Sequence, residues 1–197
     1  MMGIAAALFC LVLFSTHLMG NLYARYSTSG AGSDSARVAK FGNLTLTESG
    51  DFDGIADNEA MIIPGVDLKK DARISFEQSE VSTIVFVELT LTGPWSKAAD
   101  SETFSLCSGQ VSWRVAEGWT PLEDTACVYY KTLPPNTGLD SVAFIADDGA
   151  ITVSDQITEA GIATLYNTDI QISLRASVIQ SGGFATAAEA WAALSGK

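Results

Sequence analysis

The side chains that most often carry catalysis are sparse in this chain. His17 is the only histidine among the 197 residues, and it lies in an apolar N-terminal run. Most serine, cysteine and zinc hydrolases use imidazole as base or metal ligand, because its pKa lies near working pH. Removal of the N-terminal run would leave no such base, so we predict no catalytic residue and no cofactor. Carboxylate-only catalysis, as in glycosidases, stays open because the 23 acidic residues always offer pairs.

One loop crowded with acids is a candidate metal site. It spans residues 49–59 and contains Asp51, Asp53, Asp57 and Glu59. Carboxylates spaced two apart around a glycine can converge on a hard cation such as Ca²⁺. The spacing matches an EF-hand loop poorly. A solvated acidic loop is therefore the favoured interpretation, and no metal ligand is assigned.

Two cysteines remain outside the N-terminal run. Cys107 and Cys127 each lie at the boundary of a predicted strand. In an exported protein such cysteines can form a disulfide, which is one hypothesis for this pair. The alternative is two buried thiols that pack as small hydrophobic side chains. The sequence does not choose, because a disulfide needs Cα atoms within roughly 7 Å of each other.

Aromatic residues could form a carbohydrate-binding platform, although core packing is the commoner explanation. The residues in question are Trp95, Trp113, Trp119, Trp191, Tyr129 and Tyr130. Adjacent residues of one strand point to opposite faces. The two tyrosines therefore cannot both face one core.

The composition limits the classes of function. The chain has a net charge of −12 and a pI of about 4.3, with 47% hydrophobic and 17% charged residues. These values indicate a single globular domain with a short appendage rather than a disordered chain. They leave no basic stripe for phosphates, so nucleic acid is excluded as a partner. An anionic membrane surface would also repel the protein once its N-terminal run is gone.

The N-terminal part of the sequence predicts export. Residues 1–24 carry no charge, and Gly3 to Phe14 form an apolar run too short for a typical membrane span. We expect a signal peptide over 1–24, cleaved after Ala24, although it lacks the usual basic beginning. An uncleaved anchor is the alternative. Residues 25–42 are rich in Ser, Gly and Thr and predict a flexible N-terminal arm.

The remaining residues, 43–197, predict one β-sandwich domain. Alternating or β-branched runs separated by turn residues indicate seven to nine antiparallel strands, and the longest run should be a central strand. The predicted strands are Asn43–Glu48, Asp71–Gln78, Glu80–Thr92, Thr103–Cys107, Gln110–Ala116, Ala126–Thr132, Ser141–Ile145, Ala150–Ser154 and Asp169–Gln180.

Two helices and one hairpin complete the expected elements. A first helix is predicted over Ser154–Leu165, with Ser154 and Asp155 as capping residues. A second is predicted over 184–194, with one apolar face on the sandwich. The Asp147-Asp148-Gly149 sequence predicts a tight hairpin turn, because Asp-Gly supplies the positive φ that such turns need.

Several motifs together resemble a known family. An apolar leader is followed by LYARYST (22–28), VAKFGNLTLT (38–47) and IIPGVDLKKDARISF (62–76). This order resembles the TasA and camelysin family of exported proteins from Gram-positive bacteria, whose leaders are cut by the SipW-type signal peptidase. The later SVIQSGGFATAAEAW (177–191) is similar to the C-terminal ending of Clostridia-type relatives.

The resemblance implies a fold and a function. The implied fold is an all-β, jelly-roll-like sandwich with one or two short peripheral helices. The implied function is that of a secreted, non-enzymatic structural subunit of extracellular matrix or cell-surface fibres. Copies of this chain, or related subunits, would assemble by donating the freed arm as a β-strand to the next subunit. The candidate donor residues are Arg25, Tyr26, Val38 and Phe41.

Two other functions stay open at this stage. Camelysin relatives carry a metallopeptidase label, although no zinc ligand set is found in this sequence. A monomeric glycan-binding surface domain is the third hypothesis. Within the structural class itself, the alternative is a monomeric surface domain whose arm folds back on itself.

Overall fold

The computed structural model describes residues 39–51, 62–99, 101–123, 125, 127–166 and 168–196, without the side chain of Tyr166. Residues Lys40–Lys197 form one compact unit. The predicted signal peptide and the donor candidates Arg25, Tyr26 and Val38 lie outside the described residues.

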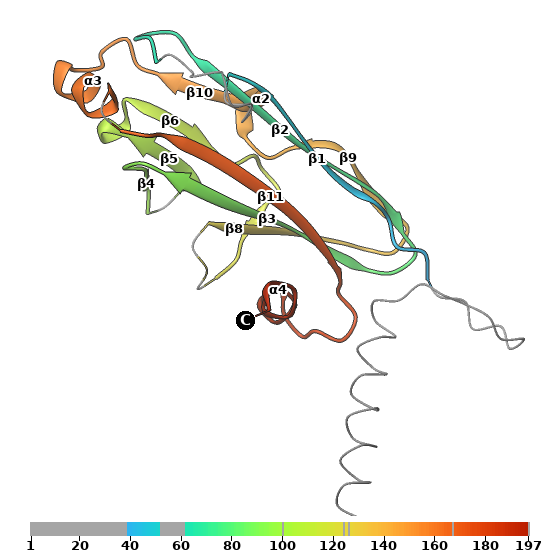
Figure 1. Ribbon diagram of the computed structural model, residues 1–197. Coiled ribbons are helices and arrows are strands. Elements are labelled where there is room, and N and C mark those ends of the chain that lie inside the picture. The colour runs from blue at the N-terminus through green and yellow to red at the C-terminus, as the bar shows by residue number, and fades with distance from the viewer. Residues whose placement is uncertain are drawn as a thin grey trace, which may run out of the picture. The chain divides into compact units, whose positions relative to one another are not determined.

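The folded unit is a sandwich of two antiparallel sheets (Figure 1). The larger sheet has seven strands, in the order β1 (Leu44–Gly50), β2 (Leu68–Ser79), β10 (Ala150–Val153), β6 (Val111–Arg114), β5 (Thr103–Leu106) and β4 (Ser96–Lys97), while β9 (Thr137–Ala143) also pairs with β2. The smaller sheet has four strands, in the order β11 (Gln171–Gln180), β3 (Thr83–Thr92), β8 (Val128–Leu133) and β7 (Thr120–Pro121).

The chain crosses repeatedly between the two sheets. It does so between β2 and β3, β3 and β4, β6 and β7, β8 and β9, and β10 and β11. Consecutive strands therefore change sheet at five points along the described chain. The prediction of an all-β antiparallel sandwich with short peripheral helices is confirmed.

The core lies between the inner faces of the sheets. Strand β2 alternates strictly, with every second residue from Leu68 to Phe76 buried. The largest inner-face side chains come from both sheets and pack in one cluster: Ile74, Phe76, Val85, Val87, Phe104, Trp113, Tyr129, Phe144 and Ile151. The alternation of buried and accessible residues along β2 is typical of a strand with one face in the core and the other in water.

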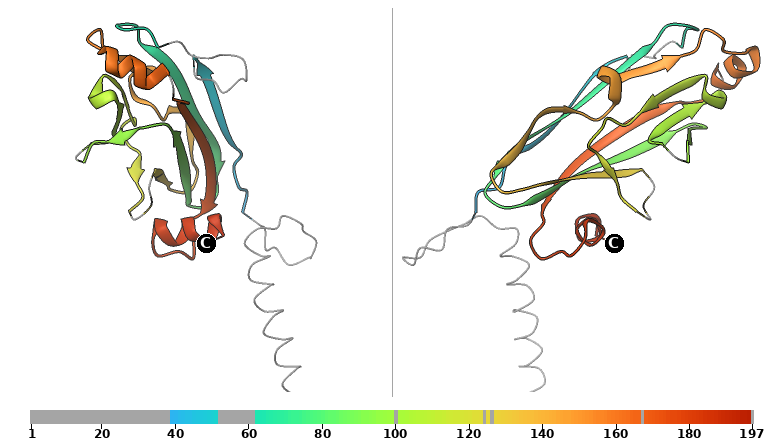
Figure 2. Two further views of the ribbon diagram at one scale, coloured as in Figure 1. Left: turned by 60° about the vertical axis from the view of Figure 1, so that its left-hand side comes forward. Right: turned by 180° about the vertical axis from the view of Figure 1, so that it is seen from behind.

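Strand β3 is buried on both faces because a helix covers its outer side. Residues Thr83 to Val87 are all buried. Helix α4 (Ala187–Ser195) lies over the outward-facing Ile84 and Phe86, and the ring centroid of Trp191 lies 5.3 Å from that of Phe86. The C-terminal helix therefore covers the part of the outer face around Ile84 and Phe86, while Thr90 further along β3 stays exposed (Figure 2).

Helix α4 begins with a capping box. The Thr186 hydroxyl accepts a hydrogen bond from the Glu189 N–H, while the Glu189 carboxylate accepts one from the Ala185 N–H. The first bond satisfies one of the free N–H groups at the helix start, whereas the second is a variant of the capping box, because the carboxylate accepts from the residue before the N-cap rather than from the N-cap itself. The cap places the start of the predicted helix at Ala187 rather than residue 184.

The first predicted helix is shorter than expected. Helix α3 spans Glu159–Tyr166, and Ser154 does not cap it because its hydroxyl accepts from the Gln156 N–H in a local turn. Thr158 takes the capping role instead, with its hydroxyl accepting from the Gly161 N–H at 3.1 Å. In the described part of the chain, no helix has both the length and the apolarity to cross a membrane.

The predicted hairpin at Asp147-Asp148-Gly149 is wrong. Strands β9 and β10 do not pair with each other, because both lie along the same edge of β2. Asp147 and Asp148 have left-handed backbone angles, with φ of 53° and 55°, and form the short turn α2 (Ala146–Gly149) between the two strands. Arg114 and Arg73 bind these two carboxylates, which holds the turn in its unusual conformation.

Candidate assembly surface

Two strands at the margins of the sheets have unpaired edges. Strand β1 ends the seven-stranded sheet and β11 ends the four-stranded sheet. Among the described strands, each therefore has one row of backbone N–H and C=O groups without a partner in its sheet, which can template an added strand. The two strands lie beside each other on one side of the sandwich (Figures 1 and 2).

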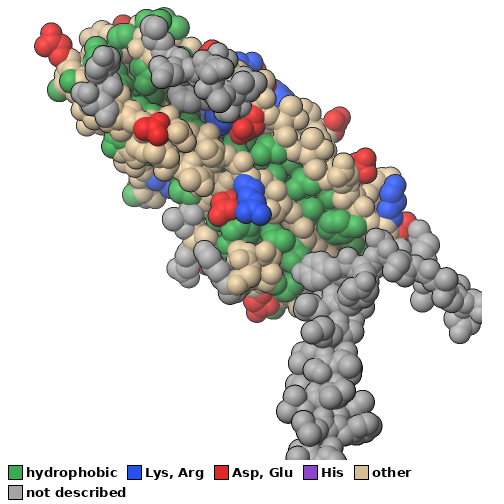
Figure 3. All heavy atoms as spheres, viewed as in Figure 1, with side chains coloured by type: hydrophobic (Ala, Val, Ile, Leu, Met, Phe, Trp, Pro, Cys, Tyr) green, Lys and Arg blue, Asp and Glu red, His purple; other side chains and the backbone are tan. Residues whose placement is uncertain are grey.

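The inner faces of these two strands are only half covered. Leu44 and Leu46 of β1, and Leu174, Ala176 and Val178 of β11, face the core but remain partly accessible. Hydrophobic side chains reach the surface on the side of the molecule that β11 and β1 form (Figure 3). We call these five residues, with the free backbone of both strands, the open edge.

An ion pair with a buried lysine links β1 to β2. Lys70 of β2 is 1% exposed, and its Nζ lies 3.2 Å from Oε1 of Glu48. The alternation of β2 places Lys70 on the core-facing side with Leu68 and Ile74, and this is the sequence signal that could have identified it. Loss of one partner from such a pair is costly because a charge stays buried.

The residues before β1 belong to the folded unit. The Glu80 and Glu77 N–H groups donate to the carbonyls of Lys40 and Asn43, which continues the β1–β2 pairing. The Phe41 ring packs edge-on against that of Phe76, with centroids 6.0 Å apart. The predicted arm 25–42 is thus too long at its C-terminal end, and its donor candidate Phe41 is already placed by the chain's own β2.

The two cysteines occupy separate sites as free thiols. The Cys107 Sγ donates to the Gly161 carbonyl at 3.6 Å, at the end of β5. Cys127 lies near Lys97 and Glu102, just before β5 begins. The two surroundings are separated by the length of β5, about 13 Å at the usual rise per residue, so of the two alternatives the structure has two separate thiols rather than a disulfide. Burial raises the pKa of both thiols, so they are poor nucleophiles.

A polar cluster reaches into the core beside Cys127. The Tyr129 hydroxyl donates to Glu102 at 2.5 Å, and the Lys97 Nζ lies 2.7 Å from the same carboxylate oxygen. Burial and the neighbouring carboxylate raise the pKa of Tyr129 far above its ordinary value. Burial would raise the pKa of Glu102, but the hydrogen bonds from Lys97 and Tyr129 outweigh it and lower that pKa. Every charge here is satisfied, which indicates a structural cluster.

The aromatic residues do not form a flat exposed platform. Trp113 and Trp119 are buried in the inner core, Trp95 packs partly buried against it, and Trp191 is a residue of α4 whose ring packs on Phe86. Tyr129 and Tyr130 point to opposite faces, as expected from their alternation: Tyr129 lies in the inner core and Tyr130 in the cluster beneath α4.

The candidate metal loop lies largely outside the described residues, as do its Asp53, Asp57 and Glu59. The described Asp51 is engaged with β2, since its carboxylate accepts from the Lys69 N–H at 2.8 Å. Its own N–H donates to the Lys69 carbonyl at 2.7 Å. Within the described ranges, no group of three histidine, cysteine, aspartate or glutamate residues could hold a metal ion.

Comparisons with known proteins identify no relative. No family model, curated protein or solved structure matches the chain. The likeness to the TasA and camelysin family therefore stays a prediction.

Proposed function

We propose that this protein is an exported, non-enzymatic structural subunit of extracellular matrix or cell-surface fibres. In this proposal a strand from one subunit adds to the open edge of the next. The observation that carries the proposal is the pair of adjacent unpaired edges, β1 and β11, whose inner faces are only half covered.

Strand addition uses both features of this surface. The free N–H and C=O groups of an edge supply affinity through main-chain hydrogen bonds. The half-covered leucines, such as Leu46 and Leu174, offer positions where every second side chain of an added strand can pack. A long, unpaired edge that is apolar on one face promotes aggregation of a monomer. Pairing with a partner strand satisfies the edge and prevents this.

The proposed donor is the arm that ends near Lys40. It comprises residues 25–39, and signal-peptide cleavage by a SipW-type peptidase would free it to reach another copy. Tyr26 and Val38 are its larger apolar side chains, while Phe41 already packs on Phe76 and acts as the fixed root of the arm. Partners would be copies of this chain or related subunits. The net charge of −12 opposes nucleic acid as a partner.

Electron microscopy of two purified chains tests the proposal. One chain starts at Arg25 and the other at Ala39, so that the second keeps Lys40 and Phe41 on β2. We expect filaments from the first chain and single particles from the second. Equal filament formation by both would contradict donation by the arm. Single particles from both, at high concentration and between pH 4 and 7, would reject the structural-subunit function.

A further inference from the structure

The large hydrophobic side chains that stand most exposed on the described residues occur at two ends of the folded unit. Ile63, Val66, Ile162 and Phe41 are each between 42% and 49% exposed. Single exposed apolar residues are ordinary, but these sit at opposite ends of strand β2. Val66 lies two residues before the first residue of β2, whereas Phe41 packs on Phe76 near its last residue.

The first group forms what we call the tip. Ile63 and Val66 face each other across the turn at Pro64-Gly65, joined by a hydrogen bond from the Val66 N–H to the Ile63 carbonyl. This turn lies against Asp155, in the segment that leads into α3, which carries Ile162. The turn and α3 stay at the same end of the sandwich in both views of Figure 2.

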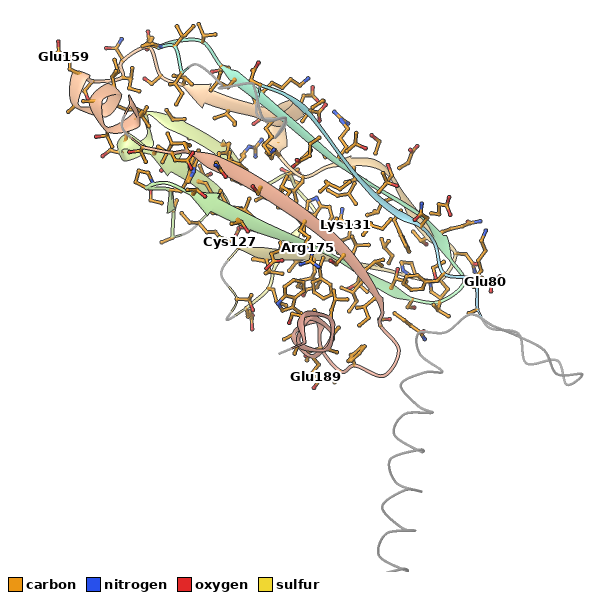
Figure 4. All side chains as sticks on the ribbon, viewed as in Figure 1. Glu80, Cys127, Lys131, Glu159, Arg175 and Glu189 are labelled. Atoms are coloured by element: carbon orange, nitrogen blue, oxygen red, sulfur yellow. The ribbon has the colours of Figure 1, made fainter. Side chains whose placement is uncertain are left out.

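The second group forms what we call the base. It consists of Phe41 and the neighbouring Lys40, which is bound to Glu80 at the far end of β2. Glu159 of α3 and Glu80 mark the two ends in Figure 4. Strand β2 alone spans about 40 Å between them, at roughly 3.3 Å per residue.

We infer that the tip of one copy docks on the base of the next, so that Ile63, Val66 and Ile162 contact Phe41 of a second copy. This inference rests on the proposed function and adds a second interface to it. Two different surfaces of the same chain would meet, which is a heterologous contact. Repeated along one direction, such a contact builds an open filament rather than a closed ring.

The origin of the arm favours this arrangement over a side-by-side one. The described chain begins at the base, so residues 25–39 leave from that end. Fully extended, they would reach about 50 Å, which exceeds the roughly 33 Å length of β11. The arm leaves one copy at its base and would lie along the open edge of the next copy. The two copies are then aligned most directly when the base of the first meets the tip of the second.

The tip contact is weak by itself. Three half-exposed side chains bury far less area than a stable interface needs, since specific interfaces bury roughly 1,200 Å² or more. A donated strand would hold the two bodies together at an effective concentration in the millimolar range, where even a weak contact is occupied. The tip therefore sets the alignment and growth of a filament, while the arm supplies the affinity.

The test separates the two interfaces. The Val66→Asp/Ile162→Asp double variant, made in the chain starting at Arg25, places charge on the tip. The control is Thr164→Asp, which adds a charge to an exposed position on the same helix. Circular dichroism verifies folding. Two readouts follow: filament formation by electron microscopy, and binding of a fluorescent synthetic peptide of residues 25–39 to each chain truncated to start at Ala39.

We expect the tip variant to bind the peptide within twofold of the unchanged chain and to lose at least tenfold in filament number, while Thr164→Asp forms normal filaments. Normal filaments from the tip variant would overturn the tip-to-base contact and leave strand donation intact. Absence of peptide binding by every chain, with no filaments, would reject the proposed function and this inference with it. A Phe41→Asp variant should reproduce the tip phenotype, because it charges the opposite partner surface.

Discussion

The outer face of the four-stranded sheet and the open edge make an instructive contrast. Both contain apolar positions of the sheets, but helix α4 covers those of the first with Trp191 and its neighbours, whereas no further described strand pairs with β1 or β11 at the second. A sheet face can be closed by a helix that binds through side chains alone. An edge also needs hydrogen-bond partners, which another strand provides best. The chain thus covers part of its sheet face with its own helix, while no further described strand pairs with its open edge.

The largest effect should come from the closed face. Phe86→Ala should lower the free energy of unfolding by about 3–5 kcal/mol, because it leaves a cavity between β3 and α4. Urea unfolding measures this loss. Thr90→Ala, at an exposed position of the same strand, is the control and should change stability by less than about 0.5 kcal/mol. A small effect of Phe86→Ala would mean that α4 does not seal the sheet.

The open edge should show the opposite behaviour, with assembly affected more than stability. Leu46→Lys and Ala176→Lys point charges toward the half-covered inner face, and each should raise the critical concentration for filaments at least tenfold. The cost in stability should be about 1 kcal/mol, because both positions are only partly buried. Static light scattering follows assembly.

The matched controls for the open edge lie on the same strands but face water. Thr47→Lys on β1 and Ser173→Lys on β11 should assemble like the unchanged chain. If only one of the two inward-facing lysines blocks assembly, the added strand pairs with that strand. If neither does, the open edge is not the acceptor.

A smaller effect is expected at the start of α4. Thr186→Ala removes the hydroxyl that accepts from the Glu189 N–H and should cost about 1 kcal/mol. Thr186→Ser keeps the acceptor and should restore most of that stability. Thermal unfolding measures both variants. Equal losses in the two would show that the methyl group, rather than the cap, stabilises the helix.

The last expected effect is a loss of stability at alkaline pH, which depends on Tyr129. The pKa of Tyr129 is raised in the folded state, so above about pH 10 the unfolded chain loses this proton while the folded chain keeps it. Stability should therefore be full below that pH and fall as the pH rises. Spectrophotometric titration should find one tyrosine that ionises only on unfolding. Tyr129→Phe should remove this part of the pH dependence.

The local pattern of apolar and polar residues was enough to predict most strands of the fold. The alternation in residues 71–78 and 169–180 predicted β2 and β11, and the β-branched run of 80–92 predicted a central strand. Each of these signals is contained within one element. The two-residue strands β4 and β7 were missed because so few residues form no period, and only their neighbours hold them in a sheet.

Features that depend on distant partners were not predictable. The Asp-Gly turn has the chemistry of a hairpin, but β2 supplies a long edge on which both flanking strands pair, and this overrides the local preference. The cysteines lie at predicted strand boundaries, yet β5 holds them apart. The open edge itself follows from the order of strands in each sheet, since nothing in the residues of β1 or β11 says which strand will be last.

The pairing of β3 with β11 also affects how fast the sandwich folds. Strand β3 lies in the first half of the chain, and its partner is the last strand. Sheets that join such distant segments fold slowly, in milliseconds to seconds, because a long loop must close first. Half of the open edge is made of β11, so the open edge is complete only after β11 has paired with β3. Under the proposed function, a subunit in which this pairing has not yet formed would lack a complete acceptor, and the slow closure of this sheet would delay its assembly.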